Sequence, residues 1–161
     1  MLLHPLRNTN SVITSPYGMR KHPVTGNYKL HNGVDLRAKT GTPIYSPANG
    51  VVRWVGWTDG GGNQISVNHE NKGIRTGYAH LSKILVKKGD VVRRGQKIGL
   101  TGNTGRSTGP HLHFTTRNFE TNEPFDPTRL DYNNINNPWV KWVLFGGAVA
   151  GAYLLYKRYG K

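Results

Sequence analysis

Short runs of β-branched and aromatic residues, separated by turns rich in Gly, Asn and Asp, fill most of the first 130 residues. Such runs are typical of strands, because these side chains pack well on a pleated sheet. The pattern is clearest at residues 51–55, 64–69, 73–80, 97–100 and 111–116. No long stretch has helical periodicity. The sequence therefore predicts a compact all-β domain of antiparallel strands with curled sheets.

Residues 1 to about 30 carry many Asn, Ser, Pro and Gly residues and are expected to be rich in loops. The start, Met1 to Arg7, lacks a basic segment followed by an apolar core and a small-residue cleavage site. We therefore expect no secretory signal there.

The hydropathy pattern changes after residue 130. Residues 131–138 are Asn-rich and end in Pro, which is typical of a linker. Residues 142–156 carry no charge. As a helix, residues 139–156 would be about 27 Å long, close to the roughly 30 Å of a hydrocarbon core. Trp at one end and Tyr at the other are typical of membrane interfaces.

These features predict three parts: a domain over residues 1–130, a linker over 131–138, and a C-terminal transmembrane helix with a basic tail over 139–161. A helix or strand pair buried in the globular domain is the alternative for the last segment. If the segment spans a membrane, the lipid bilayer is one partner of the chain.

The net charge of the chain indicates a further class of partner. The net charge is +14, from 22 Lys and Arg against 8 Asp and Glu, which favours an anionic partner. Nucleic acid, anionic lipid and the bacterial cell wall all fit. The chain has no Cys, so disulfides and thiolate metal sites are excluded. Any metal must be held by His and carboxylate side chains.

His111 and His113 lie in a segment that is predicted to be a strand. Side chains of a strand alternate, so both imidazoles project from one face and Leu112 and Phe114 from the other. Two imidazoles on one face suit a metal or a proton-transfer site. A pair of structural or exposed histidines is the alternative.

His31 and Asp35 are four residues apart, and the Asn-Gly between them disfavours a regular helix. In an extended segment their side chains share a face. His80 ends another predicted strand. Each pattern alone is compatible with a structural role. Together, two imidazoles and one carboxylate match the protein ligands of a catalytic zinc site with a fourth position open to water. Further imidazoles could then move protons and stabilise an oxyanion.

The chain resembles the lysostaphin/LytM-type zinc peptidoglycan endopeptidases, which carry a His-x-x-x-Asp motif followed much later by His-x-His. The resemblance covers about residues 12–127 and rests on the order and spacing of several motifs: Leu30-His-Asn-Gly-Val-Asp35, Tyr78-Ala-His-Leu-Ser82, Gly95-Gln-Lys-Ile-Gly99 and Pro110-His-Leu-His-Phe114.

The resemblance implies roles for five residues. His31, Asp35 and His113 match the ligands of one zinc ion, and His80 and His111 match the two catalytic histidines. It also implies a small antiparallel, barrel-sandwich-like β fold with the site in a groove between loops. Which of His80 and His111 acts as the general base, and which residues bind substrate, are left open.

One departure concerns Thr115, because many members of the family carry Glu at this position. Thr115 is not among the motif ligands, so the departure bears on tuning of the site rather than on metal binding.

We therefore expect a zinc metalloendopeptidase that hydrolyses a peptide bond in the stem or bridge of bacterial peptidoglycan. A non-catalytic wall-binding or hydrolase-activating protein on the same fold is the alternative. A nucleic-acid-binding β domain would use the positive charge but leaves the His and Asp pattern unexplained, so no nucleic-acid partner is expected. A C-terminal anchor suits the virion of a membrane-containing phage that degrades the host wall during entry. A bacterial envelope hydrolase is the alternative setting.

Overall fold

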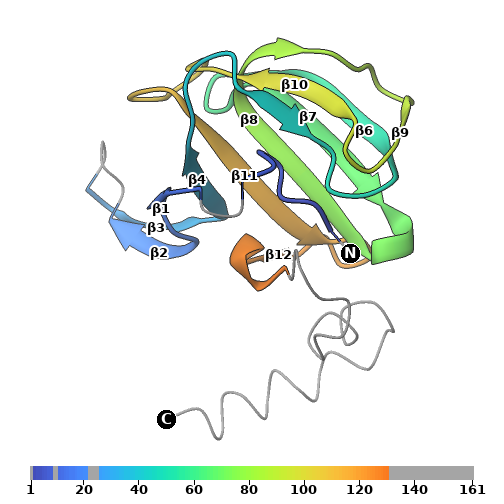
Figure 1. The fold of residues 1–161 in the computed structure, drawn as a ribbon. Coiled ribbons are helices and arrows are strands. Elements are labelled where there is room, and N and C mark those ends of the chain that lie inside the picture. Colours follow the sequence, from blue (N-terminus) through green and yellow to red (C-terminus); the bar gives the residue numbers. More distant parts are fainter. Residues whose placement is uncertain (1, 9–10, 22–25, 131–161) are drawn as a thin grey trace, which may run out of the picture.

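The computed structural model describes residues 2–8, 11–21 and 26–130. Within these residues all strand pairs are antiparallel, and the only helices are two short 3₁₀ turns (Figure 1). The strands are β1 Ile13–Ser15, β2 Gly18–Lys21, β3 Tyr28–His31, β4 Gly33–Arg37, β5 Pro43–Tyr45, β6 Gly50–Thr58, β7 Gly62–His69, β8 Ile74–Ile84, β9 Val91–Val92, β10 Lys97–Thr101, β11 His111–Asn118 and β12 Pro124–Phe125. The 3₁₀ turns are η1 Glu70–Lys72 and η2 Pro127–Arg129.

One ten-stranded sheet dominates the described residues. Its main path runs β1-β4-β11-β8-β7-β6-β9, with β10 joining β5 to β8 and β12 joining β11. Strands β2 and β3 form a separate two-stranded sheet. In Figure 1 the long strands β8 and β11 lie side by side through the middle of the domain. The prediction of an all-β antiparallel domain is confirmed, and each predicted strand segment lies on an observed strand, except that Gly73 precedes β8.

Strand β8 changes partner along its length. Residues 74–79 pair with β11, whereas residues from Leu81 onward pair with β10. His80 lies at the point of change and has a φ of 62°, in the left-handed region. A non-glycine residue seldom adopts this conformation, and such residues often mark functional sites.

The hydrophobic core forms on one face of the central strands. In β11 the side chains of Leu112, Phe114 and Thr116 are buried, while the alternate residues His111 and His113 are only partly buried. Phe114 packs on Tyr78 of β8 with ring centroids 5.4 Å apart. The expected alternation in β11 is confirmed. One strand therefore supplies apolar residues to the core and imidazoles to the opposite face.

A smaller apolar cluster joins the two ends of the described domain. Leu2 and Leu130 pack with Ala48 and Ile74, and Phe125 lies against them. Leu2 and Leu130 are each only 6% exposed. The first and last described segments of the domain therefore meet at one place.

The first thirty residues are more ordered than predicted. The expected loop-rich segment contains β1, β2 and most of β3. These strands have only three or four residues each. Such short strands depend on partners elsewhere in the chain, and β1 pairs with β4. Glycines and prolines around them gave the segment its loop-like composition.

The predicted linker at residues 131–138 and the predicted transmembrane helix at 139–161 lie outside the described residues. Among the residues that are described, no helix has the length and apolar character needed to cross a membrane. The division of the chain at residue 130 stays a prediction.

Candidate metal and catalytic site

Three strands bring His31, Asp35 and His113 together. Asp35 of β4 lies directly opposite His113 of β11 in the sheet register, and His31 ends β3 immediately before β4 begins. Asp35 Oδ1 lies 2.8 Å from His113 Nδ1 and 3.2 Å from His31 Nε2. The two nitrogens are 3.1 Å apart. Three potential ligand atoms therefore surround one point.

The close approach of β4 to β11 depends on Gly33. A Cβ at this position would lie 2.5 Å from the Phe114 carbonyl oxygen and 3.0 Å from a carbon of the His113 ring. Real Cβ atoms do not approach other atoms so closely, so a larger residue would separate the strands at the level of the metal ligands.

The other ring nitrogen of each imidazole has an oxygen acceptor. His31 Nδ1 lies 2.7 Å from the Pro16 carbonyl oxygen, and His113 Nε2 lies 3.3 Å from Asn32 Oδ1. When these nitrogens carry the proton and donate it, His31 Nε2 and His113 Nδ1 are left with free lone pairs. Such bonds orient metal-binding imidazoles and select their tautomers.

The carboxylate of Asp35 is kept ionised. Burial alone would raise the pKa of Asp35. Without a metal, however, His113 Nδ1 and His31 Nε2 can carry the ring protons instead and donate them to the carboxylate, which outweighs burial and holds the pKa of Asp35 well below its usual range. Arg20 Nη2 lies 3.8 Å from Asp35 Oδ2 and adds a positive charge beside it. The site therefore offers a negative oxygen ligand over the physiological pH range.

The donor set fits a zinc ion. The three ligand atoms all lie within 4.8 Å of one another, and two imidazoles with one carboxylate are typical of zinc sites that keep a position open. The second nitrogens are already hydrogen-bonded, so the rings need no reorientation to bind a metal. The described residues can thus hold the single zinc ion that the sequence predicted.

His80 and His111 face this group from one side. Their ring centroids are 4.6 Å apart, and the centroids of His80 and His113 are 6.1 Å apart. His111 Nε2 lies 3.7 Å from Asp35 Oδ1. All five residues predicted from the sequence therefore lie in one cluster.

Backbone carbonyls orient both of these rings. His80 Nδ1 lies 2.8 Å from the Thr104 oxygen, and His111 Nδ1 lies 2.8 Å from the Gly109 oxygen. Donation from each Nδ1–H leaves both Nε2 atoms free to accept a proton. Burial lowers the pKa of His80, and the hydrogen bond to Thr104 opposes this effect. His80 is therefore a neutral proton acceptor at neutral pH.

The backbone of His80 is held in its left-handed conformation by a neighbouring loop. The His80 N–H donates a 2.7 Å hydrogen bond to the Gly61 carbonyl oxygen. This bond and the Thr104 contact hold the ring from both the main chain and the side chain. The His80 ring is thereby fixed in position beside the metal cluster.

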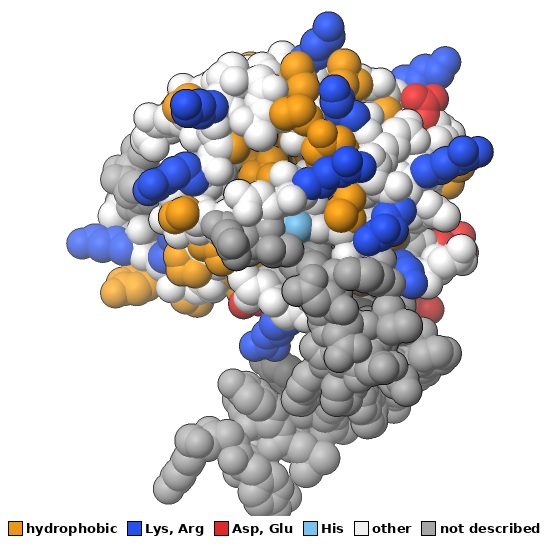
Figure 2. Space-filling model, in the orientation of Figure 1, with side chains coloured by type: hydrophobic (Ala, Val, Ile, Leu, Met, Phe, Trp, Pro, Cys, Tyr) orange, Lys and Arg blue, Asp and Glu red, His pale blue; other side chains and the backbone are white. Residues whose placement is uncertain are grey.

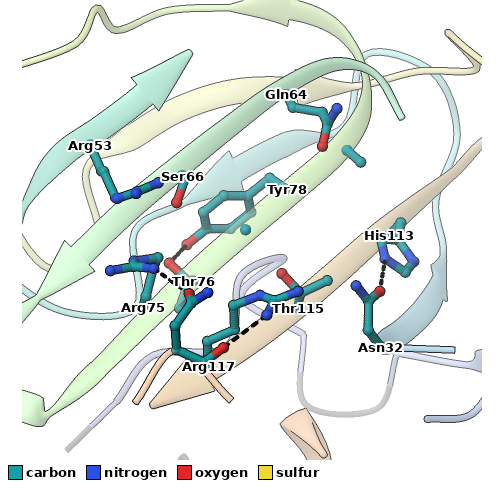
Figure 3. Close-up of a pocket in the computed structure, with 13 residues that line it drawn as sticks. Asn32, Arg53, Gln64, Ser66, Arg75, Thr76, Tyr78, His113, Thr115 and Arg117 are labelled. Atoms are coloured by element: carbon teal, nitrogen blue, oxygen red, sulfur yellow. Dashed lines mark hydrogen bonds between the residues drawn. The ribbon is translucent and has the colours of Figure 1, made fainter. Parts of the chain in front are cut away.

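A groove runs across the exposed face of β6, β7, β8 and β11 and ends at the metal cluster (Figure 3). Its volume is about 320 Å³, and His113 and Asn32 line one end.

Positive charge is also common on the outside of the domain. Figure 2 shows Lys and Arg side chains spread over one face, with few acidic side chains among them.

The sequence motifs predicted the five clustered residues but not the groups that orient their side chains. The sequence could have indicated Asn32, because this residue lies inside the His31–Asp35 motif. It could not have indicated the carbonyl groups of Pro16, Thr104 and Gly109, because any residue can supply a carbonyl. The individual roles of the five residues stay predictions.

Comparisons of the sequence with known proteins agree with one another on the family of this chain. The family described as Peptidase family M23 matches residues 29–127. The peptidoglycan DD-endopeptidase ShyB of Vibrio cholerae is 46% identical over 129 residues, which cover 80% of this chain and 30% of ShyB. The glycyl-glycine endopeptidase ALE-1 of Staphylococcus capitis is 46% identical over 115 residues, covering 69% of this chain and 32% of ALE-1. This chain thus spans about a third of the length of these two relatives.

A solved structure agrees with the sequence match. The crystal structure of a zinc-containing peptidase from Vibrio cholerae superposes with a TM-score of 0.73 at 45% identity, covering 81% of this chain and 40% of that one. The residues matched by the family model, 29–127, include both halves of the metal cluster, on β3 and β4 and on β11. The fold, the cluster and these matches together establish that the chain belongs to peptidase family M23.

Proposed function

We propose that this chain is a zinc metalloendopeptidase that hydrolyses peptide bonds in bacterial peptidoglycan. The observation that carries the proposal is the convergence of His31 Nε2, Asp35 Oδ1 and His113 Nδ1 beside two further imidazoles at the end of an open groove. The printed names of the relatives, which describe a peptidoglycan endopeptidase and a glycyl-glycine endopeptidase, support the choice of substrate.

Bound zinc would supply a Lewis acid that activates a water molecule and polarises the scissile carbonyl. His31, Asp35 and His113 would hold this ion. The chain's own proton chemistry falls to His80 and His111, whose Nε2 atoms are free while each Nδ1 is hydrogen-bonded to a carbonyl.

One of these two imidazoles accepts a proton from the attacking water at Nε2 and returns it to the leaving amine. The other takes up a proton from solvent at Nε2 and donates it as a hydrogen bond to the carbonyl oxygen, which stabilises the negative charge that develops there. The geometry permits either assignment, because the two rings lie against each other with centroids only 4.6 Å apart.

Zinc content and wall digestion test the proposal when measured on the same protein. Purified peptidoglycan is followed by turbidity, and mass spectrometry identifies the fragments and their new amines. We expect the wild type to hold about one zinc ion and to release amines. His113→Ala should lose the metal. His80→Asn should keep the metal and lose about 10²- to 10⁴-fold in rate, the usual contribution of a general acid or base. Asn suits this position because it tolerates a positive φ.

A wild type that binds zinc but releases no amine from any peptidoglycan would contradict the peptidase proposal. The wall-binding alternative would then be favoured. Metal retained by His113→Ala would instead contradict the assignment of this ligand.

The proposal extends to the C-terminal segment as a membrane anchor. Its support is the sequence alone: an uncharged run at 142–156, aromatic residues at both ends and a basic tail. Alkaline carbonate extraction of the full chain, compared with a chain ending at residue 138, tests this. Release of both forms into the supernatant would contradict anchoring. Antibody labelling of purified virions and of bacterial envelopes would separate the phage setting from the bacterial one.

A further inference from the structure

The groove that reaches His113 has a strongly basic end. Arg53, Arg75 and Arg117 line it together, and Figure 3 shows Arg53 and Arg75 at the end far from His113. Arg75 of β8 lies directly opposite Arg117 of β11. Arg53 comes from β6, at the irregularity in its pairing with β7. Three separate strands therefore direct three positive charges into one part of the groove.

The hydrogen-bond partners of Arg75 and Arg117 are uncharged in the part of the chain that the structure describes. Arg75 Nε donates a 2.8 Å hydrogen bond to Asn68 Oδ1, and its Nη1 donates to Asn122 Oδ1. Arg117 Nη1 donates a 2.8 Å hydrogen bond to the Asn122 carbonyl oxygen. No carboxylate of a described residue forms an ion pair with any of the three. Asn68 and Asn122 thus orient the guanidinium groups of Arg75 and Arg117 without neutralising them.

Such crowding is unfavourable without an anion. Partial burial, together with the charges of Arg53 and Arg117, lowers the pKa of Arg75. Because like charges repel, bringing three arginines together is unfavourable. The domain has many exposed positions at which arginines could lie apart, so the fold itself does not require this cluster. An anion bound between them would remove this repulsion. A guanidinium group recognises a carboxylate especially well, because its N–H groups can form two parallel bonds to the two oxygens.

The distance between the arginines and the metal cluster matches the length of a short extended peptide. Arg117 follows His113 by four residues on the same strand, so their Cα atoms are about 13 Å apart at 3.3 Å per residue. An extended peptide covers this distance in about four residues. Thr115, between them on the same face, contributes no charge. A peptide whose scissile bond is at the metal could therefore place a carboxylate at the arginines.

If the chain is the peptidase proposed above, a carboxylate-binding site at this distance would distinguish two classes of wall peptide. Peptidoglycan stems that contain diaminopimelate carry free carboxylates, whereas a glycine bridge has none along its length. We propose that Arg53, Arg75 and Arg117 form a carboxylate-binding subsite that selects stem peptides with a free carboxylate about three to four residues from the bond at the metal.

Binding of matched peptides tests the subsite without relying on cleavage. The zinc-loaded full chain carrying His80→Asn is titrated calorimetrically with a cross-linked diaminopimelate stem dimer, with its carboxylates either free or amidated. Pentaglycine with an acetylated N-terminus and an amidated C-terminus is the uncharged comparison. We expect the free carboxylate form to bind about 10- to 100-fold more tightly than the amide, the range for charge-assisted hydrogen bonds. Pentaglycine should bind no more tightly than the amide.

Substitutions of single arginines then show which residues cause the preference for the free carboxylate. Arg53 is exposed, so Arg53→Gln should keep the fold and reduce the preference for the carboxylate. Arg117→Gln should reduce it further. Arg93→Gln removes the same charge from an exposed residue that does not line the groove, and should leave the preference unchanged. Thr115→Glu places a competing carboxylate in the groove and should weaken the preference.

Two results would overturn the subsite: equal affinity of His80→Asn for the free and amidated dimers, or equal loss of preference in Arg53→Gln and Arg93→Gln. Hydrolysis is measured separately on the protein with His80 intact. If that protein binds the free dimer preferentially but cleaves neither dimer, the peptidase function fails while the carboxylate subsite stands.

Discussion

Acidification should destabilise the fold through His69, a residue outside the metal cluster. His69 ends β7 and is fully buried. Its Nδ1 lies 3.0 Å from the Asn49 carbonyl oxygen, and its Nε2 lies 2.9 Å from the Thr76 hydroxyl. A neutral ring satisfies both contacts, with one nitrogen as donor and the other as acceptor. Burial lowers the pKa from 6.5 to about 4, and the hydrogen bond to Asn49 opposes this only in part.

The unfolded chain therefore takes up a proton at His69 at a higher pH than the folded chain does. Stability that is present above pH 6.5 is lost as the pH falls toward 4. At 1.36 kcal/mol per pKa unit, the free energy of unfolding should fall by about 2 kcal/mol between pH 7 and pH 5, and by about 3 kcal/mol by pH 4.

Urea denaturation of the metal-free protein at several pH values measures this effect. The titrations of the other groups cancel when wild type is compared with His69→Gln, which cannot take up the proton. Between pH 7 and pH 5, the wild type should lose about 2 kcal/mol more than the variant. Equal losses in both proteins would refute the reasoning. An NMR titration that finds the His69 pKa above 6 in the folded wild type would do so without any variant.

Four other substitutions have expected outcomes. Asn32→Ala leaves His113 Nε2 without its acceptor and should weaken zinc affinity about 10- to 100-fold, measured by competition with a chelator. Gly62→Ala would bring a Cβ within 2.4 Å of the backbone of the next loop and should cost about 1–3 kcal/mol in urea denaturation, whereas Gly60→Ala meets nothing within 4 Å and should change stability by less than about 0.5 kcal/mol. Phe114→Ala, at a side chain that is 1% exposed, should cost about 3–5 kcal/mol, and a smaller loss would mean that the core collapses around the gap.

Much of the site could be predicted because its chemistry follows local spacing. The alternation in β11 is enough to place His111 and His113 on one face and Leu112 and Phe114 in the core. The fold class followed from the turn-separated strand pattern. Short strands such as β9, with two residues, could not be recognised, since their identity depends on pairing with β6 rather than on their own sequence.

The rest of the site depends on register, which no local pattern shows. Arg75 and Arg117 are 42 positions apart, and only the pairing of β8 with β11 brings them together. The left-handed conformation of His80 arises where β8 exchanges one partner strand for another. The tautomers depend on backbone carbonyls of distant loops, such as that of Thr104.

The meeting of Leu2 and Leu130 in one apolar cluster affects how the domain can be joined to other sequences. A polypeptide can enter and leave the domain at one place, so the domain can be inserted into a surface loop of a host protein without stretching that loop. A circular permutant with a short linker between these ends, opened in the exposed turn around Gly60, should keep the fold. Relatives in which the matched region is about a third of the chain show that this module does occur within longer proteins.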